Sequence, residues 1–336
     1  MPASGRQIGV AHMHDRYRQA RTFPPAWELI RQLLPRRSTI AVRRFAGHAL
    51  HATQLERPLR IVHVTDLHVG RVTPMRVQFE AAELANAAQP DLVALTGDFV
   101  CHGQKYLDEL REVLGRFQGP VYATLGNHDH WSGAREIRQV LRKANIEVLD
   151  NAHTVVELAG QKVQIVGLDD AYTGHADVKK AIRGLHADLP SIALSHIAEE
   201  AEALWQYGVP LVLSGHTHAG QVTVAGLHDM IFGRVIGHRY VHGLYGTRLA
   251  GPPSGAVYVG AGIGAAVMPL RVGQRAKREV TIFELGMPPG SIEEEHTEQT
   301  GHAGKALSER KKAQRAAKVV KNQLKRDRAA NRTRRK

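Results

Sequence analysis

From residue 59 onward, short apolar runs alternate with stretches in which apolar positions recur at helical spacing. The apolar runs are bounded by glycine, proline or aspartate, and they predict strands at 59–65, 92–96, 121–125, 146–149, 155–158, 163–166, 191–195, 211–214, 221–224, 256–259 and 280–285. The amphipathic stretches predict helices at 74–88, 104–117, 135–144, 178–185 and 198–207. Strands that alternate with helices and then pair in hairpins are typical of an α/β domain with a sheet at its centre.

The chain before this region is basic and weakly patterned. Residues 1–58 are predicted to form an N-terminal extension that is partly an amphipathic helix, with four apolar residues on one face: Trp27, Ile30, Leu33 and Leu34. Pro35 ends that helix. The helix either lies on a membrane surface, with nearby arginines close to lipid phosphates, or packs on the body of its own domain.

The chain after this region is again poor in apolar residues. The predicted domain spans residues 59–286, and residues 287–336 are predicted to be a linker and a basic tail. Residues 305–336 contain 14 Lys and Arg against 2 Asp and Glu. A segment of this composition cannot bury a core, so we expect it to be disordered, or helical only when bound.

The net charge of +13 comes from the two ends of the chain. Residues 1–60 hold 11 basic against 3 acidic side chains (net +8), whereas residues 61–304 hold 20 against 27 (net −7). The mildly acidic body argues against a nucleic-acid groove. The basic ends are still expected to suit an anionic membrane surface, or RNA in the case of the tail. No obligate protein partner is evident.

Two absences in the sequence narrow the class of protein. The single cysteine, Cys101, excludes an internal disulfide and a zinc site built from several cysteines. No run reaches the ~18–20 apolar residues that a membrane span needs, and no apolar segment of a secretory signal follows the N-terminus. We therefore expect a cytoplasmic protein, either soluble or peripheral on the inner face of the membrane.

Five short segments rich in aspartate and histidine each follow a predicted strand. They are Asp66-Leu67-His68, Gly97-Asp98, Gly126-Asn127-His128-Asp129, His196 and Gly215-His216-Thr217-His218. In α/β sheets, ligands collect at the carboxyl ends of strands, so these segments are expected to meet. Each segment alone is compatible with a turn or a surface position. The ordered set of carboxylate, amide and imidazole groups predicts a metal site.

The spacing within two of these segments supports the prediction. In an extended stretch the side chains of residues i and i+2 point the same way, so Asp66 and His68 are expected to grip one ion together. By the same argument, His216 and His218 are expected to converge on one site. A mixed oxygen and nitrogen set suits Mn²⁺, Fe or Zn²⁺ better than Ca²⁺.

The order of these motifs resembles the calcineurin-like metallophosphoesterase superfamily over roughly residues 59–285. Within it, the chain looks like the bacterial membrane-associated phosphohydrolases that include the UDP-2,3-diacylglucosamine pyrophosphatase-like group. The shared segments are Asp66–Gly70, the Gly-His-Thr-His motif with Gly220-Gln221, and Gly262-Ile263-Gly264 with Pro269 and Arg271. The resemblance implies a β-sandwich flanked by helices, in four αββα layers, and an activity on phosphodiesters or a pyrophosphate.

The resemblance also implies a specific role for each of these residues around two divalent metal ions. The first ion would be held by Asp66, His68 and His218. The second would be held by Asn127, His196 and His216. Asp98 would bridge both ions, as in other two-metal hydrolases. His128 would face the substrate and protonate the leaving oxygen as a general acid, and Asp129 would orient His128.

One position departs from the family pattern. Many members carry an acidic residue three positions after the bridging aspartate, where this chain has Cys101. The thiol is interpreted as a buried packing group, and an effect of the missing acid on metal affinity or metal choice stays open.

The sequence thus leaves two kinds of function open. The first is a dinuclear-metal hydrolase that cleaves a phosphodiester or pyrophosphate bond with metal-activated water, with a nucleotide-linked lipid at the membrane surface as a candidate substrate. The second is a soluble phosphomonoesterase, or a nucleic-acid-directed phosphodiesterase that uses the basic tail.

Overall fold

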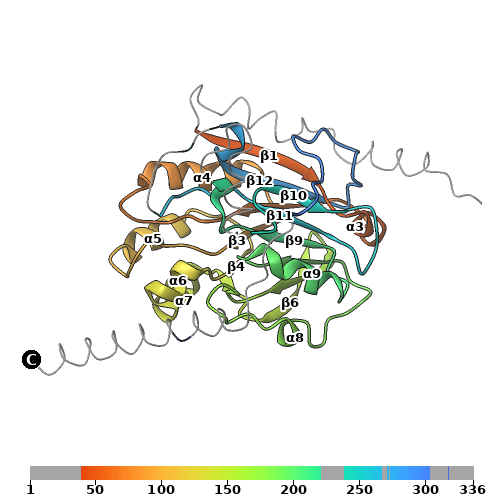
Figure 1. Ribbon diagram of the computed structural model, residues 1–336, viewed down its shortest axis with the longest axis horizontal. Helices are drawn as coiled ribbons and strands as arrows, with labels where there is room; N and C mark the ends of the chain where they lie inside the picture. Colours follow the sequence, from red (N-terminus) through yellow and green to blue (C-terminus); the bar gives the residue numbers. More distant parts are fainter. Residues whose placement is uncertain (1–38, 221–237, 267–270, 272, 303–316, 318–336) are drawn as a thin grey trace, which may run out of the picture.

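Two six-stranded sheets form the centre of the part of the chain that the structure describes, which comprises residues 39–220, 238–266, 271, 273–302 and 317 of a computed structural model (Figure 1). In spatial order, the strands of the first sheet are β1 (Ile40–Ala46), β12 (Arg278–Leu285), β2 (Leu59–Val64), β3 (Leu92–Thr96), β4 (Val121–Thr124) and β5 (Glu147–Val148). Those of the second sheet are β10 (Gly243–Gly246), β11 (Ala256–Val259), β9 (Leu211–Ser214), β8 (Ser191–Leu194), β7 (Gln161–Gly167) and β6 (Ala152–Leu158).

The two sheets pack face to face, with helices on both outer faces. The core between the sheets includes Ile61 and Ala94 from the first sheet and Leu194 and Leu213 from the second. The outer face of the first sheet is covered by α4 (Met75–Ala87), α5 (Leu107–Leu114) and α7 (Ala134–Lys143). The outer face of the second is covered by α8 (Val178–Ala181), the 3-10 turn η1 (Ala198–Glu200) and α9 (Ala201–Trp205). The predicted αββα sandwich is therefore confirmed.

The apolar runs of the sequence follow from this layering. In β3, Val93 and Leu95 face the helices, whereas Leu92 and Ala94 face the second sheet. Because both faces of the strand are covered, the strand is apolar throughout and has no polar side that would blur its limits. The predicted strands 92–96, 211–214 and 256–259 accordingly match the structure to the residue.

Several elements escaped the sequence analysis. Besides β1 and β10, these are α3 (Ala49–Gln54), α6 (Asn127–Ser132) and the 3-10 turns η2 (His218–Gly220) and η5 (Gln274–Ala276). All of the helical elements in this group are at most six residues long, too short to show a helical period. The strand predicted at 221–224 lies outside the described residues.

The folded body begins before residue 59, so the predicted boundary of the N-terminal extension is wrong. β1 pairs in parallel with β12 over all seven of its residues. This strand was not predicted from the sequence because Arg43 and Arg44 stand in the middle of it. In the structure, Arg43 contacts Glu279 and Arg44 contacts Glu284, both from the neighbouring strand β12. The helix predicted around 27–34 lies outside the described residues.

The body also continues past residue 286. Glu294 accepts hydrogen bonds from the buried Arg248 at 2.7 Å and from the backbone N–H of Ala46 at 2.7 Å. The first part of the predicted linker is therefore attached to the second sheet and to β1. Within the residues that the structure describes, no helix is both long and apolar enough to cross a membrane.

Candidate metal centre

The five predicted segments meet at one end of the sandwich. β2, β3 and β4 lie side by side in parallel, and Asp66, Asp98 and Asn127 follow their carboxyl ends. β8 and β9 are parallel neighbours in the second sheet, and His196 and His216 follow theirs. Because β3 contacts both β8 and β9 across the core, the loops of the two sheets come together.

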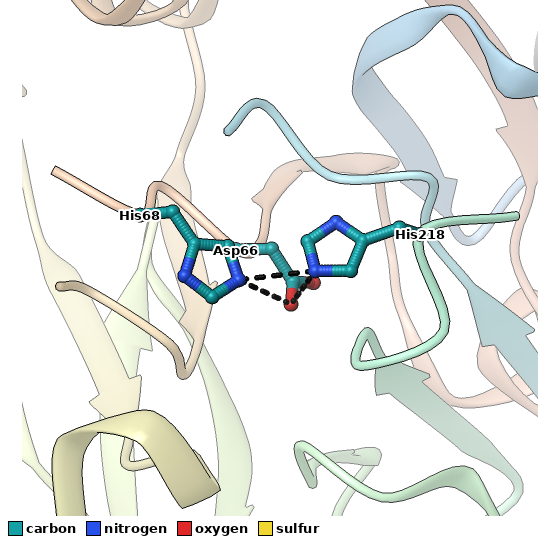
Figure 2. Close-up of side chains that lie close together, drawn as sticks. All are labelled: Asp66, His68 and His218. Carbon is teal, nitrogen blue, oxygen red and sulfur yellow. Dashed lines mark hydrogen bonds and ion pairs between the residues drawn. The ribbon is translucent and has the colours of Figure 1, made fainter. Parts of the chain in front are cut away.

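Asp66, His68 and His218 form the first cluster of side chains (Figure 2). The Nε2 atoms of His68 and His218 are 3.0 Å apart. Oδ1 of Asp66 is 3.7 Å from the former and 3.4 Å from the latter. Ligands that bind one ion with bonds of about 2.0–2.2 Å stand about 3–4 Å from one another. The three atoms therefore have the separations of a ligand set.

Asp98, His196 and His216 form the second cluster, with ligand atoms within 4.8 Å of one another. Oδ2 of Asp98 lies 3.4 Å from Nε2 of His196 and 3.5 Å from Nε2 of His68. One carboxylate oxygen of Asp98 thus faces a histidine of each cluster. This is the position that a ligand shared by two ions requires.

Five of the seven predicted ligands have a left-handed backbone, with φ values of 51° for Asp66, 43° for His68, 53° for Asp98, 76° for His216 and 52° for His218. Such a conformation costs a residue other than glycine of order 1–3 kcal/mol and is concentrated at functional sites. Asp66 and His68 therefore converge through turns and not through an extended stretch. The same turns send His216 and His218 to different clusters, so the prediction that these two converge on one site is wrong.

Several buried polar atoms of the candidate ligands have no hydrogen-bond partner. They are Oδ1 of Asp66, Oδ1 of Asn127, Nδ1 of His68, Nδ1 of His218 and Nε2 of His196. Leaving a buried polar atom unpaired costs about 1–3 kcal/mol. Carboxylate, amide and imidazole groups of this kind are the donors that Mn, Fe and Zn accept. The residues present thus fit a divalent metal centre, since bound ions would satisfy Asp66, Asn127 and His196.

Hydrogen bonds, most of them with the backbone, hold three of the candidate ligands: Asp66, Asp98 and His196. Nδ1 of His196 lies 2.8 Å from the carbonyl oxygen of Thr96, which can only accept, so Nδ1 carries the proton and Nε2 offers a lone pair. Oδ2 of Asp66 accepts hydrogen bonds from the hydroxyl of Thr65 and from the N–H of His216. Oδ1 of Asp98 accepts one from the N–H of His128. These three candidate ligands are therefore oriented before an ion binds.

Two glycines allow the loops to approach these carboxylates. A Cβ atom at Gly126 would lie 2.3 Å from Oδ1 of Asp98, and one at Gly215 would lie 2.3 Å from Oδ2 of Asp66. Both distances are far below van der Waals contact, so any larger residue would displace a candidate ligand.

Burial and the nearby carboxylates shift the pKa values of the candidate ligands in opposite directions. Burial lowers the pKa of His68 and that of His218 to about 3, which keeps both imidazoles neutral. Burial would also lower the pKa of His196, but the carboxylate of Asp98 outweighs it and raises this pKa to about 10. A cation beside Asp98 is therefore favoured at neutral pH, and a metal ion would take the place of that proton.

His128 lies beside the clusters but is not oriented as predicted. Its Nδ1 is 2.6 Å from the carbonyl oxygen of Cys101. Asp129 is fully buried and accepts hydrogen bonds from the N–H groups of Phe99 and Gly126 instead. The expectation that Asp129 orients His128 is therefore wrong, because its carboxylate is used to tie the loops after β3 and β4 together. His128 also lies close enough to His68 and Asp98 to count geometrically among possible ligands.

The thiol of Cys101 is buried, as the sequence analysis expected. Its Sγ donates to the carbonyl oxygens of His68, at 3.1 Å, and Ala265, at 3.3 Å. Cys101 thus connects the loop after β2 with the loop after β11, in addition to holding His128 through its own carbonyl.

Arg271 was given no role on the basis of the sequence. In the structure it holds a loop that contacts the backbone of the candidate ligand Asp66. Its guanidinium donates to the carbonyl oxygens of Ala261, at 2.7 Å, and Gly264, at 2.5 Å. The N–H of Gly264 in turn donates to the carbonyl oxygen of Asp66 at 2.7 Å. The only signal in the sequence was the family resemblance of the segment around Gly264 and Arg271.

Known metallophosphoesterases are similar to this chain in sequence. Residues 59–220 match the family model of the calcineurin-like phosphoesterases. The chain is 32% identical to the phosphodiesterase YaeI of Escherichia coli over 68% of its own length and 82% of that protein. It is 31% identical to the metallophosphoesterase YkuE of Bacillus subtilis, over 67% of its own length and 78% of that protein. A solved metallophosphoesterase structure from Sphaerobacter thermophilus matches with a TM-score of 0.31 and 16% identity, over 62% of this chain and 77% of that one.

The αββα sandwich and the adjoining Asp/His clusters at its strand ends define the class of metal-dependent phosphoester hydrolases. The match to the family model and the similarity to the two sequence relatives establish that the chain belongs to the calcineurin-like phosphoesterase family. It is a metallophosphoesterase.

Proposed function

We propose that the chain hydrolyses a phosphodiester or pyrophosphate bond at a centre of two divalent ions, which are Mn, Fe or Zn. The observation that carries this proposal is the position of Asp98, whose Oδ2 faces His68 of one cluster and His196 of the other. One ion would be held by Asp66, His68 and His218, and the other by Asn127, His196 and His216. Asp98 would belong to both. When bound, two such ions clamp a phosphate and supply hydroxide near neutral pH.

His128 supplies the proton in this proposal. Nδ1 of His128 donates to the carbonyl oxygen of Cys101, so Nε2 is the ring nitrogen that remains open to the leaving oxygen, and it gives up a proton there when both ring nitrogens are protonated. His128 is only partly buried, in contrast to Asp66 and His196, and so remains within reach of a substrate. A proton donor matters most when the leaving group is an alkoxide, as it is in most phosphodiesters. The similarity to a relative named as a phosphodiesterase supports the same bond type.

A screen of hydrolysis rates tests this proposal. The metal-loaded protein should be compared on phosphomonoesters, phosphodiesters, cyclic nucleotides and UDP-2,3-diacylglucosamine, at matched concentrations. We expect a diester or the pyrophosphate to be cleaved faster than any monoester. A consistent preference for monoesters would contradict the proposal and favour a phosphomonoesterase that uses the same metal centre.

A substrate at a membrane surface is the more specific part of the proposal. The sequence supports it through the basic ends, which carry +8 in residues 1–60 and +12 in residues 305–336 by their Lys, Arg, Asp and Glu counts. Each basic side chain near an anionic surface contributes about 1 kcal/mol of attraction at most. Anionic vesicles should therefore raise the rate on UDP-2,3-diacylglucosamine and leave the rate on a small soluble diester unchanged. Equal rates with neutral and anionic vesicles would contradict the membrane role, and salt-sensitive binding of RNA by the tail would favour a nucleic-acid partner instead.

A further inference from the structure

A row of aromatic rings stands beside the candidate metal clusters. The ring of His128 lies 5.0 Å from that of Trp131, and Trp131 lies 5.9 Å from Tyr172 in an edge-to-face arrangement. Tyr172 in turn lies 5.0 Å from the ring of His216, a candidate ligand of the second ion. The row therefore starts at the candidate proton donor and ends at a candidate metal ligand, with Trp131 and Tyr172 between them.

Trp131 and Tyr172 are partly exposed, whereas most of the candidate ligands are buried. Neither ring belongs to any of the three hydrophobic core clusters. Two large aromatic side chains that are partly exposed, add little to the core and stand beside the candidate metal clusters can contact a ligand in addition to the residues that they already touch. The chain therefore places two partly exposed aromatic rings in contact with His128 and His216, next to the candidate metal clusters.

The segments that carry the two rings are fixed to each other. Nε2 of His130, the neighbour of Trp131, lies 2.7 Å from Oδ1 of Asp169, and the ring of His130 stacks on that of His175 at 4.1 Å. Asp170 accepts hydrogen bonds from both the N–H and the hydroxyl of Thr173, the residue after Tyr172. These contacts involve the neighbours of Trp131 and Tyr172 and hold α6 against the loop after β7. The relative position of the two rings is therefore set before any substrate binds.

We propose that Trp131 and Tyr172 bind a planar aromatic group of the substrate, either a nucleobase or an aryl group, on its leaving-group side. The proposal rests on the proposed function, because the leaving-group side is defined by His128 as the proton donor. Trp131 contacts His128 directly, so a group that leaves with the proton from His128 lies against Trp131. An aromatic group of this kind stacks on the ring of Trp131 and contacts the neighbouring ring of Tyr172.

The energy of stacking sets the size of the expected effect. Removing one aromatic partner of a stacked base typically lowers affinity by roughly 5- to 100-fold. The loss should fall on KM, since the ring is distant from the bond that breaks, and it should be confined to substrates that carry the planar group. A ring that merely supports α6 would instead affect every substrate alike.

A matched pair of phosphodiesters tests the proposal on the full-length, metal-loaded protein. One is a dinucleoside monophosphate, and the other is its counterpart without the base on the leaving sugar, so that the leaving hydroxyl groups are chemically alike. Trp131→Ala and Tyr172→Ala should each lower kcat/KM on the first substrate by roughly 5- to 100-fold and on the second by less than about twofold. Trp131→Phe should retain most of the activity. A phenyl alkyl diester as a third substrate distinguishes an aryl group from a nucleobase, and a selective loss on either one supports the proposal.

Two controls accompany these variants. Tyr207 is 46% exposed and precedes β9, at the opposite end of that strand from His216, so Tyr207→Ala should change nothing. Elemental analysis should find the same metal content in all variants. An equal loss on the base-bearing and the base-free diester would overturn the proposal and make Trp131 a structural residue.

Fluorescence separates a failure of this proposal from a failure of the proposed function. A nucleoside monophosphate should quench part of the tryptophan emission of the metal-loaded protein, and Trp131→Phe should abolish the quenching while Trp27 and Trp205 still emit. Should the wild-type protein cleave neither diester, the phosphodiesterase proposal fails. The quenching experiment then decides alone, and the absence of quenching by any nucleotide or aryl phosphate overturns the aromatic site.

Discussion

Nδ1 of His128 lies 2.6 Å from the carbonyl oxygen of Cys101, so a backbone group and not the neighbouring carboxylate fixes this imidazole. A carbonyl can only accept a hydrogen bond, so Nδ1 of His128 is the donor to it, and Nε2 is left to face a leaving group and to protonate it when both ring nitrogens carry a proton. The loop that supplies the carbonyl is itself attached through the thiol of Cys101 to the loop that carries His68. The proton donor and the metal ligands are thus positioned by the same backbone segments.

This relationship predicts how His128→Asn behaves. The variant should lower kcat on an alkyl phosphodiester by roughly 10²–10⁴-fold, because it removes the proton donor. The loss should shrink on a p-nitrophenyl ester, whose leaving group needs no proton, and metal content should stay unchanged. Steady-state kinetics measure kcat on the two esters, and elemental analysis measures the metal content. Metal loss together with an equal drop on both substrates would make His128 a ligand instead.

The position of Asp98 between the two clusters predicts that its removal affects both. Asp98→Ala should release metal from both clusters and abolish hydrolysis, because Oδ2 of Asp98 faces His68 and His196 alike. Elemental analysis of protein purified without chelator should find up to two ions per chain in the wild type, and fewer in the variant. The matched control is Asp108→Ala, since the Asp108 side chain is 94% exposed and lies away from the clusters, on α5. A variant at Asp98 with full metal content would contradict the bridging role.

The buried His51 predicts a loss of stability in acid. Its Nε2 lies 2.9 Å from the carbonyl oxygen of Ser191, and its Nδ1 accepts from the N–H of His48, so the ring is held neutral. Burial lowers the pKa of His51 to about 4, below the value of about 6.5 in the unfolded chain. Below pH 6.5 the unfolded state therefore binds the extra proton, and the folded state loses stability as the pH falls towards 4.

His51→Gln should remove this part of the pH dependence. Between pH 6.5 and pH 4, the wild type should lose up to about 3 kcal/mol in free energy of unfolding relative to the variant. Denaturant titrations of the metal-free proteins measure the difference, because the titration of the metal ligands is then common to both. The exposed His186 provides the control, and His186→Gln should follow the wild-type curve. Parallel curves for wild type and His51→Gln would show that this buried histidine does not control acid stability.

The pairing of β1 with β12 predicts a sharp limit for N-terminal truncation. Deleting residues 1–38 leaves β1 complete, and we expect the melting temperature to stay within a few degrees of that of the full chain. Deleting residues 1–57 removes β1, uncovers Phe283 and leaves Glu279 without the arginine that it contacts. Removing one partner of a buried ion pair costs about 3–5 kcal/mol, and the edge of the first sheet is lost as well, so this shorter chain should unfold or aggregate. Equal melting temperatures for the two truncations would contradict the assignment of β1 to the folded body.

The sequence by itself determined which residues gather at the candidate metal centre. Asp66, Asp98 and His196 each follow an apolar strand that is covered on both faces, and parallel strands deliver their carboxyl ends to a common edge. Both the apolar run and the polar residue after it are local features of the chain. An α/β domain with a central sheet and the neighbourhood of the candidate ligands could therefore be inferred without coordinates, and the sandwich followed from the family resemblance.

Tertiary structure alone decided which partners the charged and aromatic side chains around the site and the sheet contact. The basic stretch around Arg43 becomes a strand because Glu279, 236 positions further along the chain, compensates its charge. Asp129 is adjacent to His128 in sequence, yet its carboxylate binds backbone N–H groups of two loops. Trp131 and Tyr172 meet because α6 and the loop after β7 come from different sheets that pack together. Such pairings arise between segments far apart in the chain, and local periodicity holds no information about the contacts between them.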